Sequence, residues 1–152
     1  MEEQKIALVE GNQGASDPAE LAWAFPEVNA GQAPFGGRVI VQLRRIRKTA
    51  KGSRIILVDE TKENEKWQNM IGKVIAIGPL AFKNRETMAS WPEGSWAQVG
   101  DYVRVPKWGG DRWERTVPNE NDSDTPVLFM TINDHELIAK VTDDPLSFNV
   151  FI

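Results

Sequence analysis

The sequence predicts an all-β protein built on a small β-barrel, with long loops and extended N- and C-terminal arms. Short apolar runs rich in Val and Ile recur along residues 37–141, a pattern typical of strands. The stretches between them contain Gly, Pro and Asn and lack a long helical period, which favours a barrel or a sandwich. The 152 residues suit one domain. We therefore expect an N-terminal arm (1–36), the barrel (37–141) and a C-terminal tail (142–152).

Four strand-forming stretches follow one another along the barrel segment. Apolar residues alternate at period two in the first, and the second closes on the turn-forming pair Gly78-Pro79. The stretches are residues 38–44, 73–77, 101–105 and 126–132, and the last runs through Asn133-Asp134 into residues 136–141. Their side chains predict a core that includes Val39, Val41, Leu43, Ile75, Ile77, Val103, Val105, Leu128 and Leu137.

The arm is rich in Gly, Ala, Pro and acidic residues, with one apolar patch that contains Leu21, Trp23 and Phe25 and stops at Pro26. This patch is too brief for a helix that stands alone. Ordering each residue costs about 1–2 kcal/mol of backbone freedom, and three buried apolar side chains return only about 5–9 kcal/mol. We therefore expect the arm to be ordered by a neighbouring molecule, with these three residues as its anchors.

Two connections, residues 47–71 and residues 79–98, are long for a compact domain, and such loops are usually functional or disordered. The second contains Trp91 and Trp96, whose role the sequence leaves open. Trp108 and Trp113 flank a glycine-containing stretch that suggests a hairpin tip able to stack on single-stranded nucleic acid. Packing under loops or at subunit contacts is the more favoured interpretation of the tryptophans.

Composition narrows the classes of function. No apolar run approaches 18 residues, which excludes a membrane-spanning helix, and no cysteine is present to support disulfides or thiol chemistry. The acidic start is unlike a signal peptide, so we expect an intracellular site of synthesis. The net charge of −4 argues against generic nucleic-acid binding. The segment from Arg38 to Arg54 contains seven basic residues and no acidic residue. This charge pattern is typical of either a face that contacts a partner or a solvated strand face.

The sequence offers little for catalysis, and we expect a protein that is not an enzyme and uses no cofactor or metal. His135 is the only histidine, so a histidine-based metal site or a catalytic triad with spare ligands is disfavoured. Its place after Asn133-Asp134 favours a turn or helix-cap role. The Gly-Gly pairs at 36–37 and 109–110 lack the Lys-Ser/Thr of a phosphate-binding loop and are interpreted as turns.

Five stretches, in order, resemble the co-chaperonin (GroES-like) family. They match its opening strand, the apolar end of its mobile loop, the strand after that loop, its Val-Gly-Asp-x-Val turn and its closing strand. The five are Gly37-Arg38-Val39-Ile40-Val41, Lys51-Gly52-Ser53-Arg54-Ile55-Ile56-Leu57, Gly72-Lys73-Val74-Ile75-Ala76-Ile77-Gly78, Val99-Gly100-Asp101-Tyr102-Val103 and Leu137-Ile138-Ala139-Lys140-Val141. The match covers residues 37–141, and the terminal extensions look more like the versions encoded by tailed phages.

The resemblance implies a GroES-like barrel that forms a ring and caps a chaperonin. It also implies that Ile55, Ile56 and Leu57 enter a groove of the chaperonin as the partner-binding residues; the alternative is an ordinary strand covered by the chain's own core. Ser53-Arg54 stands where the family has paired glycines, which is expected to stiffen the loop.

Two functions follow as expectations. The first is a homo-oligomeric co-chaperonin-like lid in the host cytoplasm that assists folding by docking on a chaperonin. The alternative is a GroES-fold virion structural protein, a capsid decoration or stabilising subunit whose arm clamps neighbouring phage capsid proteins. Neither function needs a membrane or a specific nucleic acid.

Overall fold

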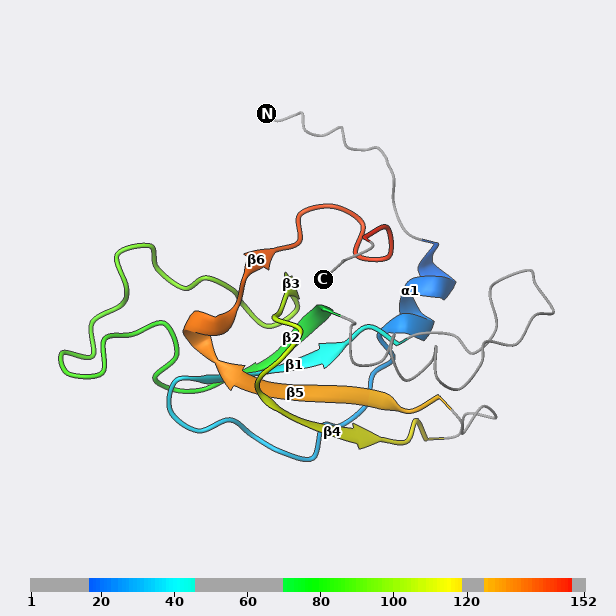
Figure 1. The fold of residues 1–152 in the computed structure, drawn as a ribbon, viewed down its shortest axis with the longest axis horizontal. Helices are drawn as coiled ribbons and strands as arrows, with labels where there is room; N and C mark the ends of the chain where they lie inside the picture. Colours follow the sequence, from blue (N-terminus) through cyan, green and yellow to red (C-terminus); the bar gives the residue numbers. More distant parts are fainter. Residues whose placement is uncertain (1–16, 46–69, 119–124, 149–152) are drawn as a thin grey trace.

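The structure, a computed structural model, describes residues 17–45, 70–118 and 125–148. In these ranges the protein is mostly β, as the sequence predicts, with one short α-helix and one turn of 3₁₀-helix (Figure 1). The elements are α1 (Pro18–Ala24), β1 (Arg38–Leu43), β2 (Ile71–Ile77), β3 (Tyr102–Arg104), β4 (Asp111–Arg115), β5 (Val127–Asn133), η1 (Asp134–Glu136) and β6 (Ala139–Lys140).

All six strands belong to one antiparallel sheet in the order β4-β5-β1-β2-β3-β6. The central strand β1 pairs with β2 on one side and with β5 on the other. Within the described residues, β4 and β6 form the two edges of the sheet. The sheet begins at Arg38, next to the expected boundary between arm and barrel.

A β-bulge in β2 changes which side chains face the core. Val39 pairs with Ile77 and Ile40 with Ala76, but Val41 pairs with Val74, so Ile75 is an extra residue without a partner on β1. Such an insertion reverses the alternation of side chains along a strand. Period two therefore fails here: Ile77 packs against the main core, whereas Ile75 packs on the opposite face of the sheet.

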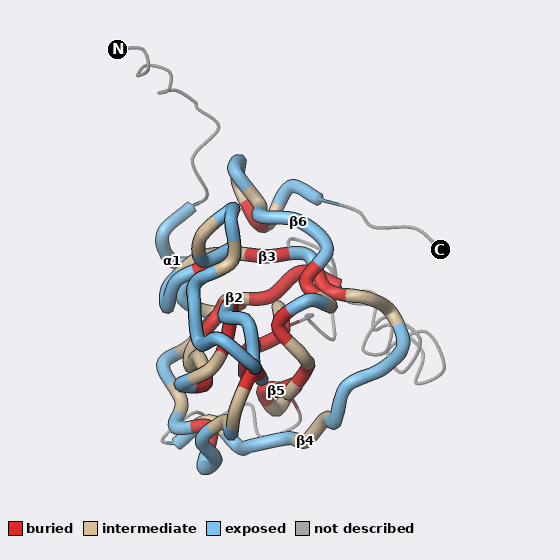
Figure 2. The backbone as a smooth tube through the Cα atoms, turned by 90° about the vertical axis from the view of Figure 1, so that its left-hand side faces the viewer, coloured by how far each residue is buried: buried red, intermediate tan, exposed pale blue. Residues whose placement is uncertain are grey.

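The main core packs against the sheet. Figure 2 shows that β2 is buried or half-buried along its length, whereas β4 and β6 are mostly exposed. The core contains the predicted residues Val39, Val41, Leu43, Val103, Val105 and Leu137, with Ile77 and Leu128 packed partly buried against it. The long connection 79–98 contributes Phe82 and Ala97. Part of this connection is therefore a cover for the core.

The opposite face holds a second apolar cluster around Ile40 and Phe129. Trp113, on β4, stacks on Phe129 with ring centroids 5.6 Å apart, and its indole Nε1 donates to the Ala30 carbonyl at 2.8 Å. Residues 109–112 do not form the hairpin tip considered from the sequence, because Asp111 and Arg112 belong to β4, which pairs with β5 and not with the preceding strand β3. This tryptophan packs within the fold, while Trp108 remains 67% exposed.

Helix α1 follows from local sequence and from packing. The Asp17 side chain caps it by accepting from the Ala19 N–H at 2.9 Å, and Pro18 occupies the first turn, where its missing N–H costs nothing. Seven residues are too few for a stable isolated helix, so contacts with the sheet must stabilise it. No helix in the described ranges is long and apolar enough to cross a membrane.

Candidate partner-binding site

The predicted partner-binding residues Ile55, Ile56 and Leu57 lie outside the described residues. The stretch that contains them connects β1 to β2, two neighbouring strands at the centre of the sheet. Its two ends are described, and they meet: the Arg44 N–H donates to the Ile71 carbonyl at 2.9 Å. We call this region, formed by Arg44, Arg45, Met70 and Ile71, the loop base.

Arg45 ties the loop base to the N-terminal arm. Its side chain is buried, with Nε donating to the Trp23 carbonyl and Nη1 to the Thr125 carbonyl, both at 3.0 Å. The guanidinium carbon lies 4.3 Å from the centroid of the Trp23 ring, a cation–π distance. The backbone N–H of Arg45 also donates to the Ala24 carbonyl at 2.9 Å. This member of the basic run is therefore buried within the fold.

Arg44 ties the loop base to the C-terminal tail. Its Nη1 donates to the carbonyls of Pro145 and Phe148, both at 2.9 Å. Burial lowers the pKa of Arg44, and the negative charge of Asp144 partly opposes this shift. Neighbouring side chains of an extended segment point to opposite faces. Arg44 therefore contacts the C-terminal tail, whereas Arg45 contacts the N-terminal arm.

The expected arm anchors belong to a cluster within the same chain. Phe25 packs edge-on against Tyr102 with centroids 5.1 Å apart, and Ala24, Phe25 and Ile71 form the buried centre. Leu21 and Trp23 pack partly buried around it, as do Val141 and Leu146 from the C-terminal tail. The arm, the tail and the loop base therefore share one apolar cluster. Contact of these anchors with a neighbouring molecule stays a prediction.

Hydrogen bonds to the arm run mainly to its main-chain carbonyls. Gln42 Nε2 donates to the Pro26 carbonyl at 2.7 Å, in addition to the bonds from Arg45 and Trp113 already described. These bonds were not anticipated from the sequence, which considered only apolar anchors. They supply the extra attachment that the entropy of ordering demands.

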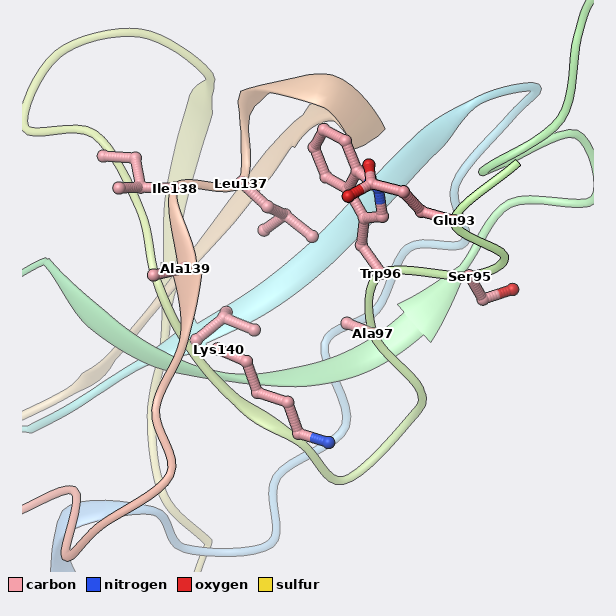
Figure 3. A pocket seen from close by; sticks show the side chains of 9 residues that line it. Glu93, Ser95, Trp96, Ala97, Leu137, Ile138, Ala139 and Lys140 are labelled. Carbon is pink, nitrogen blue, oxygen red and sulfur yellow. The ribbon is translucent and has the colours of Figure 1, made fainter. Parts of the chain in front are cut away.

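Trp96 of the 79–98 connection lines a groove at the β3–β6 edge (Figure 3). Trp91 and Trp96 pack edge to face at 4.8 Å, and Phe82 contacts both. The Trp96 Nε1 donates to Glu93 Oε1 at 2.9 Å. The groove has a volume of about 440 Å³, and nothing in the sequence pattern indicated it. Its lining consists of Glu93, Ser95, Trp96, Ala97, Val103, Leu137, Ile138, Ala139 and Lys140.

The region around His135 is structural in its contacts. Asp134 is buried, and its Oδ2 accepts from the Phe82 N–H while its Oδ1 accepts from the His135 N–H, each at 2.8 Å. The Glu136 side chain accepts from the Asn133 N–H at 2.9 Å, so the segment forms a capped 3₁₀ turn. Among the described residues, no group of three or more His, Asp or Glu side chains could hold a metal ion.

No protein-family model matches this chain, and no curated protein matches it at a significant level.

Proposed function

We propose that this chain is a co-chaperonin-like protein of tailed-phage type, with a GroES-like barrel that assembles into a ring. In this proposal it docks on a chaperonin through Ile55, Ile56 and Leu57 and assists protein folding in the host cytoplasm. The observation that carries the proposal is the position of this tripeptide. It falls in the connection between two adjacent central strands whose ends are pinned together at the loop base.

The positions of the motifs support the same proposal. The opening-strand motif falls on β1, the following motif on β2, the Val-Gly-Asp turn directly before β3, and the closing motif over β6. The motif that forms β2 begins at Gly72 and ends at Gly78, and both positions require glycine for steric reasons. A Cβ at Gly72 would collide with Val41 Cγ1, and a Cβ at Gly78 would collide with the Gly36 carbonyl oxygen. The glycines of this motif thus allow the close approach of neighbouring segments in the sheet.

The energetics fit weak docking sites that act together. Three aliphatic side chains contribute on the order of 1.5–3 kcal/mol each when buried, and ordering the rest of the loop offsets a comparable amount. Useful affinity then requires several loops in one ring to bind at once.

The contacts of the arm favour the lid over the virion subunit. The virion hypothesis relies on a neighbouring molecule to hold the arm, but residues 17–30 are already attached to their own sheet by Arg45, Gln42 and Trp113. These contacts attach the described arm within its own chain, which weakens the reason for invoking a neighbour.

The test measures binding of the full chain to a purified chaperonin ring. Ile55→Ser, Ile56→Ser and Leu57→Ser combined should abolish binding while leaving thermal stability unchanged. The control is Trp108→Ser, which removes an exposed aromatic side chain elsewhere (67% exposed) and should bind like the wild type. Undiminished binding by the triple variant would overturn the docking role. Absence of chaperonin binding by the wild type, together with its recovery in purified phage particles, would establish the virion hypothesis instead.

A further inference from the structure

Strand β6 is an exposed edge of the sheet with an apolar groove beside it. Both of its residues are exposed, and within the described residues no further strand lies beyond it. The outer side of an edge strand presents unpaired N–H and C=O groups, which proteins usually cover or pair with another strand. Next to β6, Ile138 is 52% exposed and lines the groove together with Trp96. The edge therefore offers a backbone ladder and an apolar hollow to an extended segment.

The groove is shaped to take alternate side chains of such a segment. Its floor is apolar and buried, formed by Ala97, Val103 and Leu137. In Figure 3 the Leu137 side chain points into the hollow and the Trp96 indole forms one wall. The volume of about 440 Å³ is that of a ligand-sized pocket. Every second residue of a strand added to β6 would point into this hollow.

The N-terminal arm contains a segment that fits this edge. Besides the patch at residues 21–25, the arm has a second apolar run, Ile6-Ala7-Leu8-Val9, which we call the N-terminal run. Ile and Val are among the residues that favour strands. Residues 10–16, which connect the run to α1, are small or polar, a composition typical of a linker. The N-terminal run is therefore the part of residues 1–16 with apolar side chains to bury.

The position of α1 brings the N-terminal run within reach of the groove. Phe25, directly after α1, packs on Tyr102 with ring centroids 5.1 Å apart, and Tyr102 precedes Val103 of the groove floor. The seven residues of α1 add about 10 Å to this path. An extended chain from Val9 to Asp17 spans at most roughly 26–29 Å. Because Tyr102 and Val103 point to opposite faces of the sheet, the connection passes round the β6 edge, and it is long enough to do so.

Connectivity and charge agree on the direction of the N-terminal run. Val141 follows β6 and packs in the same cluster as α1, so the end of the run that leads to α1 lies at the Lys140 end of the groove. In Figure 3 Glu93 lies at the opposite end. The run is preceded by Lys5 and followed by Glu10. A direction parallel to β6 places Lys5 near Glu93 and Glu10 near Lys140, whereas the reverse direction would bring like charges together.

The other charges near these two ends do not reverse this preference. Asp101 lies 3.5 Å from Lys140 and already neutralises it, so the contact of Lys5 with Glu93 carries most of the preference. Glu93 also accepts from Trp96, and a carboxylate has capacity for further hydrogen bonds. Glu3 is the acid that most closely precedes Lys5, and in an extended chain it lies about 7 Å beyond that lysine, past the end of the groove.

We propose that the N-terminal run adds to the edge of β6 as a parallel strand of the same chain, with Ile6 and Leu8 in the groove. Ile6 then lies beside Ile138, and Ala7 lies beside Ala139 on the other face. A tethered segment has an effective concentration in about the millimolar range, which favours it over a second copy at ordinary protein concentrations. The run closes the sheet edge and covers the groove. This inference goes beyond the proposed function and depends on neither the chaperonin nor the ring.

Crosslinking within the full chain tests the contact directly. The chain has no cysteine, so Ala7→Cys combined with Ala139→Cys supplies the only two thiols and keeps both groove-facing side chains of the run. A short bismaleimide should join the thiols within one chain, detected as a modified monomer by mass spectrometry, at a rate that dilution does not change. The control combines Ala7→Cys with Ala33→Cys, at an exposed position that lines the separate hollow beside β4 and β5. It should crosslink at least about 10-fold more slowly.

Substitutions added to the Ala7→Cys and Ala139→Cys chain test both sides of the contact. Ile6→Ser with Leu8→Ser should slow crosslinking at least about 10-fold, because two apolar side chains no longer bind the groove. Val9→Ser, on the opposite side of the run, is the matched control and should change the rate little. In the groove, Ile138→Ser should slow crosslinking, whereas Val99→Ser, at an exposed position outside the groove, should not. Circular dichroism of each variant verifies that the fold is intact.

Each contrary outcome overturns a definite part of the proposal. Crosslinked dimers in place of modified monomers would mean that the groove takes the run of a second copy. Equal rates for the pairs with Ala139 and Ala33 would show that the run is not held at β6. Unchanged crosslinking after Ile6→Ser with Leu8→Ser, or after Ile138→Ser, would remove the groove from the contact. None of these measurements involves a chaperonin, so failure here is distinguishable from failure of the proposed function.

Discussion

Replacement of Arg45 by methionine tests how the arm, the sheet and the loop base are held together. Methionine keeps an apolar stem of similar length and deletes the guanidinium. The carbonyls of Trp23 and Thr125 each lose a charged donor at 3.0 Å, and the Trp23 ring loses its cation at 4.3 Å. The backbone bond from Arg45 to Ala24 remains.

The expected loss of stability is the difference between the interactions that Arg45 makes and the cost of burying its charge. Two hydrogen bonds from a charged donor contribute about 1.5–3 kcal/mol each, and the cation–π contact adds roughly 0.5–2 kcal/mol. Methionine avoids the cost of removing a guanidinium from water, which offsets several kcal/mol of that loss. We expect the free energy of unfolding to fall by about 3 kcal/mol. That is a large share of the 5–15 kcal/mol typical of a domain.

Urea denaturation followed by tryptophan fluorescence measures this change. The control is Arg104→Met, at an exposed position on β3, which should change stability by no more than about 0.5 kcal/mol. Arg45→Lys should fall between the two, because an ammonium group lacks the planar fork that reaches both carbonyls. A loss below about 0.5 kcal/mol for Arg45→Met would refute the assignment of Arg45 as the main attachment of the arm.

Two further predictions concern the same sheet. Gly72→Ala should lower the free energy of unfolding by about 2 kcal/mol or more, because the new Cβ collides with Val41 Cγ1 and lies 3.0 Å from the Gln42 carbonyl oxygen; an unchanged urea midpoint would contradict this. Burial raises the pKa of the Tyr102 phenol above its ordinary value of 10.0, so the stability that this group contributes is present below pH 10.0 and is lost as the pH rises through the folded-state pKa. Tyr102→Phe should therefore lose less stability than the wild type in urea midpoints taken up to about pH 11, and equally steep alkaline losses would disprove this.

The predicted core strands were recoverable from sequence because their signals are local. Alternation identified β1, and apolar runs bounded by turn residues located β2, β3 and β5. β4 was missed because Asp111–Arg115 contains one apolar residue, Trp113. Its strand conformation comes from pairing with β5 and from stacking on Phe129. The bulge at Ile75 was equally hidden, because it appears only in the register between β1 and β2.

The loop base and the groove could not be predicted for a related reason. Arg45 looks like any member of a basic run until residues 23 and 125 bring carbonyl groups to it. The groove joins residues 93–97 to residues 137–140, two segments that are separated in the sequence by β3, β4 and β5. A site that is assembled from distant segments produces no periodic pattern in the sequence. The resemblance to co-chaperonins located the tripeptide but offered no guide to the terminal extensions.

The way in which the arm is attached has an evolutionary consequence. Arg45, Gln42 and Trp113 donate to main-chain carbonyls of residues 23, 26 and 30, and a carbonyl oxygen is present whatever side chain the residue has. Exposed arm positions such as Glu27 and Gln32 can therefore drift while the attachment survives. Ala30, which is buried, and Gly31, whose φ is 80°, remain constrained. The three donors cannot drift in this way. Among related chains, we expect selection on the arm to be visible in the sheet that holds it.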